Sequence, residues 1–231
     1  VGLHKTGTST IQSCLFRNRK CLESTEGYCY PPINKNHGST IYTMFSDTPE
    51  NFITNVKNNL TDAKKISEYK KKLFTLYQEE ISKTKAANLV ISGESISLLS
   101  KKELIKLRDF FSSYSDNVYA VLWLRSPLEW CRSMSQQYIK QGMATLKEIE
   151  SNPPIIEYRN IISLLSYVFG KKRLAITSFD DALTHTGGIF GRFCDDINIS
   201  KSFWEKTEPL KLNKSVSFES LLLISYLNER K

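Results

Sequence analysis

Three short apolar segments constrain the fold of this chain more than any other feature. Each is rich in branched or aromatic residues, lacks polar alternation and lies between stretches with helical periodicity: NLVIS (88–92), NVYAVLWL (117–124) and RLAITSF (173–179). Such uninterrupted runs are typical of strands that are buried on both faces of a parallel sheet. Strands that alternate with helices predict an α/β fold with three layers, in which helices flank a parallel sheet.

Helical periodicity fills most of the chain between these strands. We expect helices directly after the opening segment and at residues 63–86, 101–114, 127–141, 155–169, 187–196 and 217–229. The 231 residues, of which 40% are hydrophobic, can bury one sizeable core, so we expect a single domain over residues 1–231. The segment 23–62 has Gly, Pro and Asn but little periodicity, and we predict an irregular lid or substrate-binding segment there.

The chain opens with VGLHKTGTSTIQ, in which small hydroxylated residues surround two glycines. Such a loop leaves backbone N–H groups accessible, and with Lys5 inside it and a helix downstream it predicts an anion-binding cradle. The nucleotide-binding pattern G-x-x-x-x-G-K-[ST] does not fit, because Gly2 and Gly7 have its spacing but Thr8 occupies its Lys position. A turn that only caps a helix is the alternative. Because such loops follow a strand, we also expect an N-terminal strand ahead of Val1.

A second motif, RSPLEWCRSMSQQY, follows the strand at 117–124. At the strand end, Arg125 offers a planar fork of donors that suits a phosphate group. Pro127 suits the first position of a helix, and Ser133 lies about two turns along that helix. The alternative is an ordinary helix start in which Arg125 only pairs with Glu129.

Together, the two motifs resemble those of the sulfotransferases that use 3′-phosphoadenosine 5′-phosphosulfate, particularly the bacterial and carbohydrate-directed members. In that family a Lys–(Thr/Ser)–Gly–Thr–(Thr/Ser) run follows the first strand, and a later strand ends in Arg with Pro and Ser at the spacing of residues 125, 127 and 133. The resemblance implies a P-loop-like fold and this nucleotide as sulfuryl donor, with adenosine 3′,5′-bisphosphate as product. The implied nucleotide-binding residues are His4, Lys5, Thr6, Gly7, Thr8, Ser9, Thr10, Arg125 and Ser133.

Within this resemblance, the loop and Lys5 would bind the 5′-phosphosulfate, and Arg125 and Ser133 would bind the 3′-phosphate. His4 is expected mainly to shape the loop. No metal ion is required, because Lys5 and the loop amides can neutralise the charge that develops on the bridging oxygen. The chain departs from the family after its third strand, where Phe179-Asp180-Asp181 replaces a Tyr-Glu-Asp segment, and the contacts to adenine therefore stay open.

Glu94 and His37 are the two candidates for the catalytic base. Sulfuryl transfer needs an in-line nucleophile and a group that accepts its proton. Glu94 follows the strand at 88–92, where related cytosolic enzymes place a catalytic His, and partial burial there would raise its pKa toward neutrality. Glu94 could instead cap the helix that begins near residue 100 or pair with a Lys. His37, in the segment NKNHGST, is the rival base or an acceptor contact.

The amino-acid composition limits which ligands, metals and membranes the protein can be expected to bind. A net charge of +8 suits an anionic nucleotide and an acidic substrate, whereas Lys residues mixed with Glu along helices do not favour nucleic acid. Five cysteines without a C-x-x-C pair indicate reduced thiols and no zinc site. No uninterrupted apolar run of 18 residues occurs, so we expect no membrane span and a cytoplasmic protein.

The sequence thus predicts a sulfotransferase that modifies a hydroxyl or amine of a small-molecule acceptor, for which a carbohydrate is the best candidate. Two other classes stay open: a nucleotide kinase or other phosphotransferase of similar topology, and a non-catalytic module that binds anions or nucleic acid. The first lacks the Gly-Lys-Thr order, and the second does not account for two separate nucleotide motifs. No pattern in the sequence indicates the identity of the acceptor or the oligomeric state.

Overall fold

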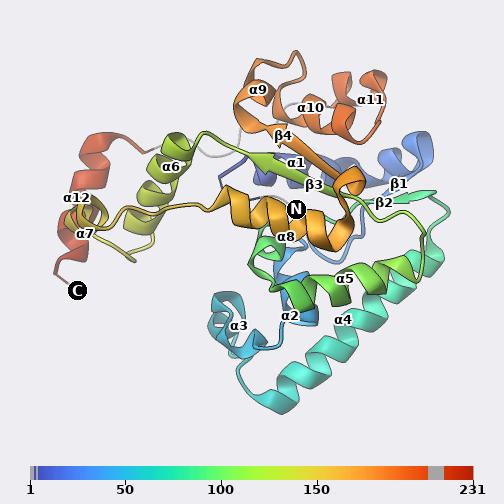
Figure 1. The fold of residues 1–231 in the computed structure, drawn as a ribbon, viewed down its shortest axis with the longest axis horizontal. Coiled ribbons are helices and arrows are strands. Elements are labelled where there is room, and N and C mark those ends of the chain that lie inside the picture. Colours follow the sequence, from blue (N-terminus) through green and yellow to red (C-terminus); the bar gives the residue numbers. More distant parts are fainter. Residues whose placement is uncertain (1–2, 4, 208–215, 231) are drawn as a thin grey trace.

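The computed structural model describes residues 3, 5–207 and 216–230 and has the mixed α/β character that the sequence predicts (Figure 1). The first half contains α1 (Thr8–Cys21), β1 (Tyr28–Cys29), α2 (Gly38–Phe45), α3 (Ile53–Lys57), α4 (Ala63–Lys83), β2 (Asn88–Leu89) and α5 (Lys101–Ser112). The second half contains β3 (Ala120–Leu124), α6 (Pro127–Lys140), α7 (Leu146–Ser151), α8 (Tyr158–Phe169), β4 (Leu174–Ser178), α9 (Phe179–Thr184), α10 (Gly188–Asp196), α11 (Lys201–Glu205) and α12 (Phe218–Asn228). The predicted helices all occur, with ends that shift by a few residues.

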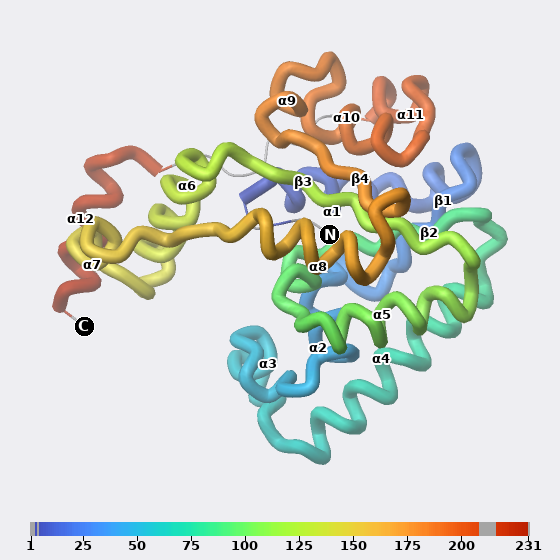
Figure 2. Tube along the Cα trace, in the orientation of Figure 1, coloured from blue at the N-terminus to red at the C-terminus, as the bar shows by residue number. Residues whose placement is uncertain are grey.

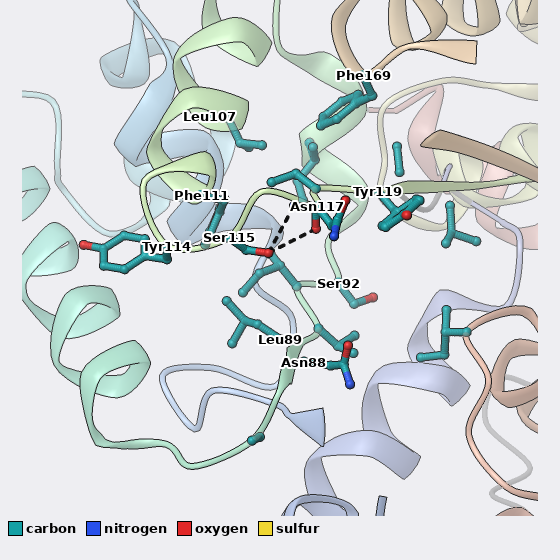
Figure 3. Close-up of a pocket in the computed structure, with 18 of the residues that line it drawn as sticks. Asn88, Leu89, Ser92, Leu107, Phe111, Tyr114, Ser115, Asn117, Tyr119 and Phe169 are labelled. Atoms are coloured by element: carbon teal, nitrogen blue, oxygen red, sulfur yellow. Dashed lines mark hydrogen bonds between the residues drawn. The ribbon is translucent and has the colours of Figure 1, made fainter. Parts of the chain in front are cut away.

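The strands pair in parallel, as predicted, but in two separate pairs. β1 lies beside β2, and β3 lies beside β4 with Ala120 opposite Leu174 and Leu124 opposite Ser178. A cavity of about 590 Å³ lies between the pairs, lined by residues 88–92 on one side and 117–121 on the other (Figure 3). Within the described residues the four strands therefore do not form one sheet, and the three-layer arrangement around a single sheet stays a prediction.

Strand β3 contributes to two separate hydrophobic cores. Ala120 and Leu122 pack into a first core with residues of α2, α4, α5 and α8. Trp123 packs into a second core with residues of α1, α10 and α11. Because successive side chains of a strand point to opposite faces, one strand can serve both cores. Figure 1 shows α5 and α8 on one side of β3 and α10 and α11 on the other.

The neighbouring strand β4 is less buried than its apolar sequence predicts. Ala175 and Ile176 are exposed, whereas Thr177 is buried and donates a hydrogen bond to Asp196 Oδ2 over 2.6 Å. Among the residues that the structure describes, β3 and β4 pair only with each other, so edge position does not distinguish the two strands. The prediction of a strand buried on both faces is wrong for β4, because residue type alone does not reveal which side chains the surrounding helices cover.

The segment 23–62 is also more regular than predicted. It contains the end of a π-helical turn, β1, a turn of 3-10 helix and the helices α2 and α3. α2 buries Ile41, Met44 and Phe45 in the first core. These three residues have the i, i+3, i+4 spacing of a helix face, a signal that is short enough to be missed between Gly38 and Pro49.

Towards the C-terminus, α6, α7 and α12 group together (Figure 2). The buried Ser225 of α12 accepts a hydrogen bond from the backbone N–H of Leu146 over 2.7 Å, and Asn228 donates to the carbonyl oxygens of Ile139 and Ala144. These bonds connect α12 to the end of α6 and the start of α7. None of the helices in the described part of the chain is long and apolar enough to cross a membrane.

Two residues that lie opposite each other in the β3–β4 register test this burial pattern. Leu122 is fully buried, whereas its partner Ile176 is 46% exposed. We expect Leu122→Ala to lower the free energy of unfolding by about 2–5 kcal/mol, because it leaves a cavity in a packed core. Ile176→Ala should cost less than about 1 kcal/mol. Urea denaturation monitored by circular dichroism measures both, and equal losses would mean that β4 is covered in solution.

Candidate active site

The N-terminal loop that the sequence predicts to bind an anion, which contains Lys5, Thr6 and Gly7, leads directly into α1. Gly7 is the N-cap of this helix and has φ = 73°, a left-handed conformation that favours glycine. A Cβ atom on Gly7 would lie 2.9 Å from Cε2 of Phe179, so close packing also requires glycine. The N–H groups of Thr8 and Ser9 precede the first hydrogen bonds of the helix, which Thr10 and Ile11 donate to the Gly7 carbonyl oxygen. This arrangement provides N–H donors at a positive helix end.

The hydroxyl groups of Thr6 and Thr8 in this loop donate hydrogen bonds to other groups of the protein. Thr6 is fully buried and donates to the carbonyl oxygen of Leu3 over 2.7 Å. Thr8 is also buried and donates to Oε1 of Glu94. The hydroxyl groups of Thr6 and Thr8 are therefore engaged within the protein, and Thr6 has no exposed surface with which to contact a ligand, so its predicted contact with the nucleotide is not available in this structure. Ser9 and Thr10 are half-buried in the first turn of α1, whereas His4 lies outside the described residues.

Lys5 lies in a cluster of charges. Its backbone has φ = 68°, a left-handed conformation that is uncommon for a residue other than glycine. Burial lowers the pKa of Lys5, the nearby charges of Lys140 and Arg125 lower it further, and the carboxylate of Glu94 opposes them. An anionic ligand at this place would meet several cations that partial burial leaves incompletely solvated.

β2 is shorter than the predicted strand at 88–92, and Glu94 follows it after four residues that belong to no helix or strand. Glu94 begins a turn of 3-10 helix, Glu94–Leu98, and is half-buried. Through the bond from Thr8, the Glu94 carboxylate is tied to the first turn of α1. The alternative role as a cap of α5 is wrong, because Ser100 and Glu103 form the capping box of that helix.

Arg125 connects the second motif to the loop. Its Nη1 donates to the Lys5 carbonyl oxygen over 3.2 Å, although 120 residues separate the two in the sequence. The guanidinium lies over the ring of Phe179, 5.1 Å from its centre, and its Nη2 is 3.8 Å from Oε2 of Glu129. Within the described residues, Arg125 Nε is buried without a hydrogen-bond partner. Pairing with Glu129 thus occurs, but it leaves one donor of Arg125 unused.

Pro127 is the first residue of α6, as predicted, and Ser133 is half-buried two turns further along. The assignment of Ser133 to a phosphate group stays a prediction. Phe179, which the sequence suggested only as a loss of a family hydroxyl, contacts both Arg125 and the position of Gly7. An aromatic residue directly after an apolar strand was the available signal for this packing role.

His37 is not in an exposed loop. It is fully buried at the N-cap of α2, where its Nε2 donates to the carbonyl oxygen of Pro31 over 3.0 Å and its Nδ1 accepts from the Ser92 N–H over 3.3 Å. The backbone N–H of His37 donates to the Ser92 carbonyl oxygen over 2.9 Å. His37 therefore holds the chain two residues before Glu94.

Two glycines bring α2 close to the segment that carries Glu94. A Cβ atom on Gly93 would lie 2.4 Å from the Cα of Gly38, which is too close for any side chain. The motifs HGS and GES contain these glycines, but the sequence did not reveal that they meet. In the described part of the chain, no three His, Cys, Asp or Glu side chains gather in a way that could hold a metal ion, and the expectation of metal-free chemistry stays a prediction.

No family model matches the chain, and no curated protein matches it. Its fold is similar to the crystal structure of a sulfotransferase from Alicyclobacillus acidocaldarius, with a TM-score of 0.51. The similarity covers 99% of this chain and 90% of that chain at 13% sequence identity. The protein therefore has a sulfotransferase-like fold. At this identity the likeness concerns the path of the backbone, so an argument about function has to come from the side chains of the site.

The burial of His37 predicts how the stability of the protein depends on pH. Burial lowers the pKa of His37 from 6.5 to about 4, so the unfolded chain binds a proton between these values that the folded protein does not. The stabilisation is fully present above pH 6.5 and is lost as the pH falls towards 4. At about 1.4 kcal/mol per pKa unit, it amounts to about 3 kcal/mol.

We expect urea denaturation between pH 7 and 4.5 to show this loss in the wild-type protein and a smaller loss in His37→Asn. The imidazole Cε1 proton of His37 in the folded protein should keep its NMR shift from pH 8 to 5. A His37 signal that titrates near pH 6.5 would contradict the buried neutral ring.

Proposed function

We propose that this protein is a sulfotransferase that moves a sulfuryl group from 3′-phosphoadenosine 5′-phosphosulfate to a hydroxyl or amine, with a carbohydrate as the proposed acceptor. One observation carries the proposal: the hydrogen bond from Arg125 Nη1 to the Lys5 carbonyl oxygen brings together the two motifs that the sequence predicts to bind anions. A donor with phosphate groups at both its 5′ and 3′ positions needs two such motifs side by side. The sulfotransferase-like fold supports the same interpretation.

The residues fit this donor. The Lys5 ammonium and the N–H groups at the start of α1 suit the 5′-phosphosulfate, because they combine a flexible cation with a helix N-terminus. Arg125 has a buried Nε without a partner among the described residues, which suits a further anionic group, and we assign the 3′-phosphate to Arg125 and Ser133. The donor supplies the activated sulfuryl group.

In the proposed reaction, an acceptor oxygen or nitrogen attacks sulfur and its proton passes to the carboxylate of Glu94. The new bond to sulfur forms while the bond from sulfur to the 5′-phosphate oxygen breaks, and that oxygen leaves with the electron pair. Lys5 stabilises the negative charge that grows on the leaving oxygen. Thr8 orients Glu94 by its hydrogen bond, and His37 holds the backbone behind it. Lys5 and the loop amides suffice for this charge, so we propose that no metal ion takes part.

Isothermal titration calorimetry with two nucleotides tests the proposed function. We expect adenosine 3′,5′-bisphosphate to bind more tightly than ATP with Mg²⁺, because the second motif is matched to a 3′-phosphate. Preference for ATP with Mg²⁺ would instead indicate a kinase or related phosphotransferase. Equal and weak binding of both would indicate an anion-binding module without nucleotide selectivity.

Lys5 should be essential for turnover. We expect Lys5→Met to lower kcat by at least about 100-fold while the melting temperature stays within a few degrees of wild type, because its charge acts mainly on the transition state. Lys20→Met, at an exposed position near the C-terminal end of α1, is the control and should keep wild-type turnover. The measurement is transfer of radiolabelled sulfate from the donor to a panel of hydroxyl- and amine-bearing sugars. Near-wild-type kcat in Lys5→Met would refute this role.

Glu94→Gln tests the base. The amide oxygen can still accept the hydrogen bond from Thr8, so donor affinity should persist, whereas kcat should fall by about 10²–10⁴ because the amide cannot take a proton. His37→Asn should keep the pH dependence of kcat even if the variant is less stable, since His37 is buried away from the solvent. If Glu94→Gln keeps most of its turnover while His37→Asn loses its pH dependence, the two roles are reversed.

A further inference from the structure

Two side chains from outside both motifs hold the backbone that carries Arg125. Tyr158, the first residue of α8, donates from its hydroxyl to the Arg125 carbonyl oxygen over 2.7 Å and accepts from the Arg125 N–H over 3.4 Å. Asp180, in the first turn of α9, accepts through Oδ2 from the N–H of Ser126 over 2.9 Å. Three backbone groups in two consecutive residues are thus bound by side chains that lie 33 and 54 positions further along the chain.

These backbone groups need such partners because they belong to no regular element. β3 ends at Leu124 and α6 begins at Pro127. The N–H and C=O groups of Arg125 and the N–H group of Ser126 therefore lie between the hydrogen bonds of the strand and those of the helix. Partly buried backbone groups without partners are costly. Without Tyr158 and Asp180 the turn could adopt several conformations, and the guanidinium at its end would shift with it.

The side chain of Arg125 is held from the other direction. Its Nη1 donates to the Lys5 carbonyl oxygen, and its guanidinium lies over Phe179, the residue directly before Asp180. Burial raises the pKa of the Tyr158 hydroxyl and the Asp180 carboxylate raises it further, while the backbone bond to Arg125 and the Arg125 charge lower it. Tyr158, Asp180 and Arg125 therefore form one cluster of mutually interacting polar groups.

We propose that Tyr158 and Asp180 are positioning residues that set the affinity of the site for the 3′-phosphate of the nucleotide, and thereby its preference for 3′-phosphorylated donors. They act through the backbone of Arg125 and do not themselves touch the ligand. A guanidinium that binds a phosphate has to lie within about 0.5 Å of its productive position. The hydrogen bonds of Tyr158 and Asp180 to the backbone would hold the turn, and with it Arg125, at this position and so increase the selectivity for a 3′-phosphate. This inference rests on the proposed function.

Calorimetry with adenosine 3′,5′-bisphosphate and with adenosine 5′-phosphate, which lacks the 3′-phosphate, provides the test. Tyr158→Phe removes only the hydroxyl. We expect it to raise the Kd of the bisphosphate about 3- to 10-fold and to change the Kd of adenosine 5′-phosphate by a clearly smaller factor, as the loss of one or two hydrogen bonds next to the 3′-phosphate site predicts. Tyr167→Phe, at an exposed position of the same helix, is the matched control and should change neither value.

Asp180 provides a second, independent pair of variants. Asp180→Asn keeps an oxygen that can accept from the Ser126 N–H and should retain the preference for the bisphosphate, whereas Asp180→Ala should lose part of it. Melting temperatures of all variants show whether each is folded. If Tyr158→Phe or Asp180→Ala weakens both nucleotides equally, or neither, Tyr158 and Asp180 are only structural and the inference is wrong.

The wild-type protein separates this failure from a failure of the proposed function. If the wild type binds adenosine 3′,5′-bisphosphate no better than adenosine 5′-phosphate, it has no 3′-phosphate site and the proposed function is wrong. If the wild type prefers the bisphosphate and Tyr158→Phe and Asp180→Ala keep the full preference, the site exists and only the positioning role is refuted.

Discussion

The hydrogen bond between Arg125 Nη1 and the carbonyl oxygen of Lys5 is the contact on which the candidate site depends. It joins the end of β3 to a loop in which Lys5 has a left-handed backbone, a conformation that costs on the order of 1–3 kcal/mol for a residue other than glycine. Such a conformation persists only where surrounding contacts impose it. Arg125 and the packing of Phe179 against Gly7 supply these contacts, so the shape of the loop and the proposed recognition of phosphate depend on the same residues.

The position of this contact follows from the two cores. Leu122 anchors β3 in one core and Trp123 anchors it in the other, so the strand cannot shift without disrupting both. The end of β3 therefore has a well-defined position relative to α1, whose buried residues belong to the second core. The first core also positions Glu94. The hydrogen bond of His37 with Ser92 and the close approach of Gly38 to Gly93 connect the segment that carries Glu94 to α2, which packs in that core. Residues from both cores thus meet at the site.

Sequence patterns were reliable where local chemistry decides the structure. The helix start at Pro127 and the parallel pairing of β3 with β4 agree with expectation. The same sequence patterns gave wrong predictions where the burial of a side chain depends on residues that are distant in the sequence. His37 resembles a loop residue among Asn, Gly and Ser, yet α2 and the segment at Ser92 enclose it. Ile176 resembles a core residue, yet its side chain is 46% exposed.

By itself, the sequence determined the chemistry available to the site: a cation within a glycine-rich loop, an Arg at a strand end and a carboxylate after another strand. Residue type and spacing suffice for this, because helix starts and strand ends depend on neighbouring residues. Only the tertiary structure decided that Arg125 contacts the Lys5 backbone, that Thr8 holds Glu94 and that Tyr158 fixes the turn. Contacts across 33 to 120 residues depend on how packed helices and strands place their ends, and no local pattern encodes that placement.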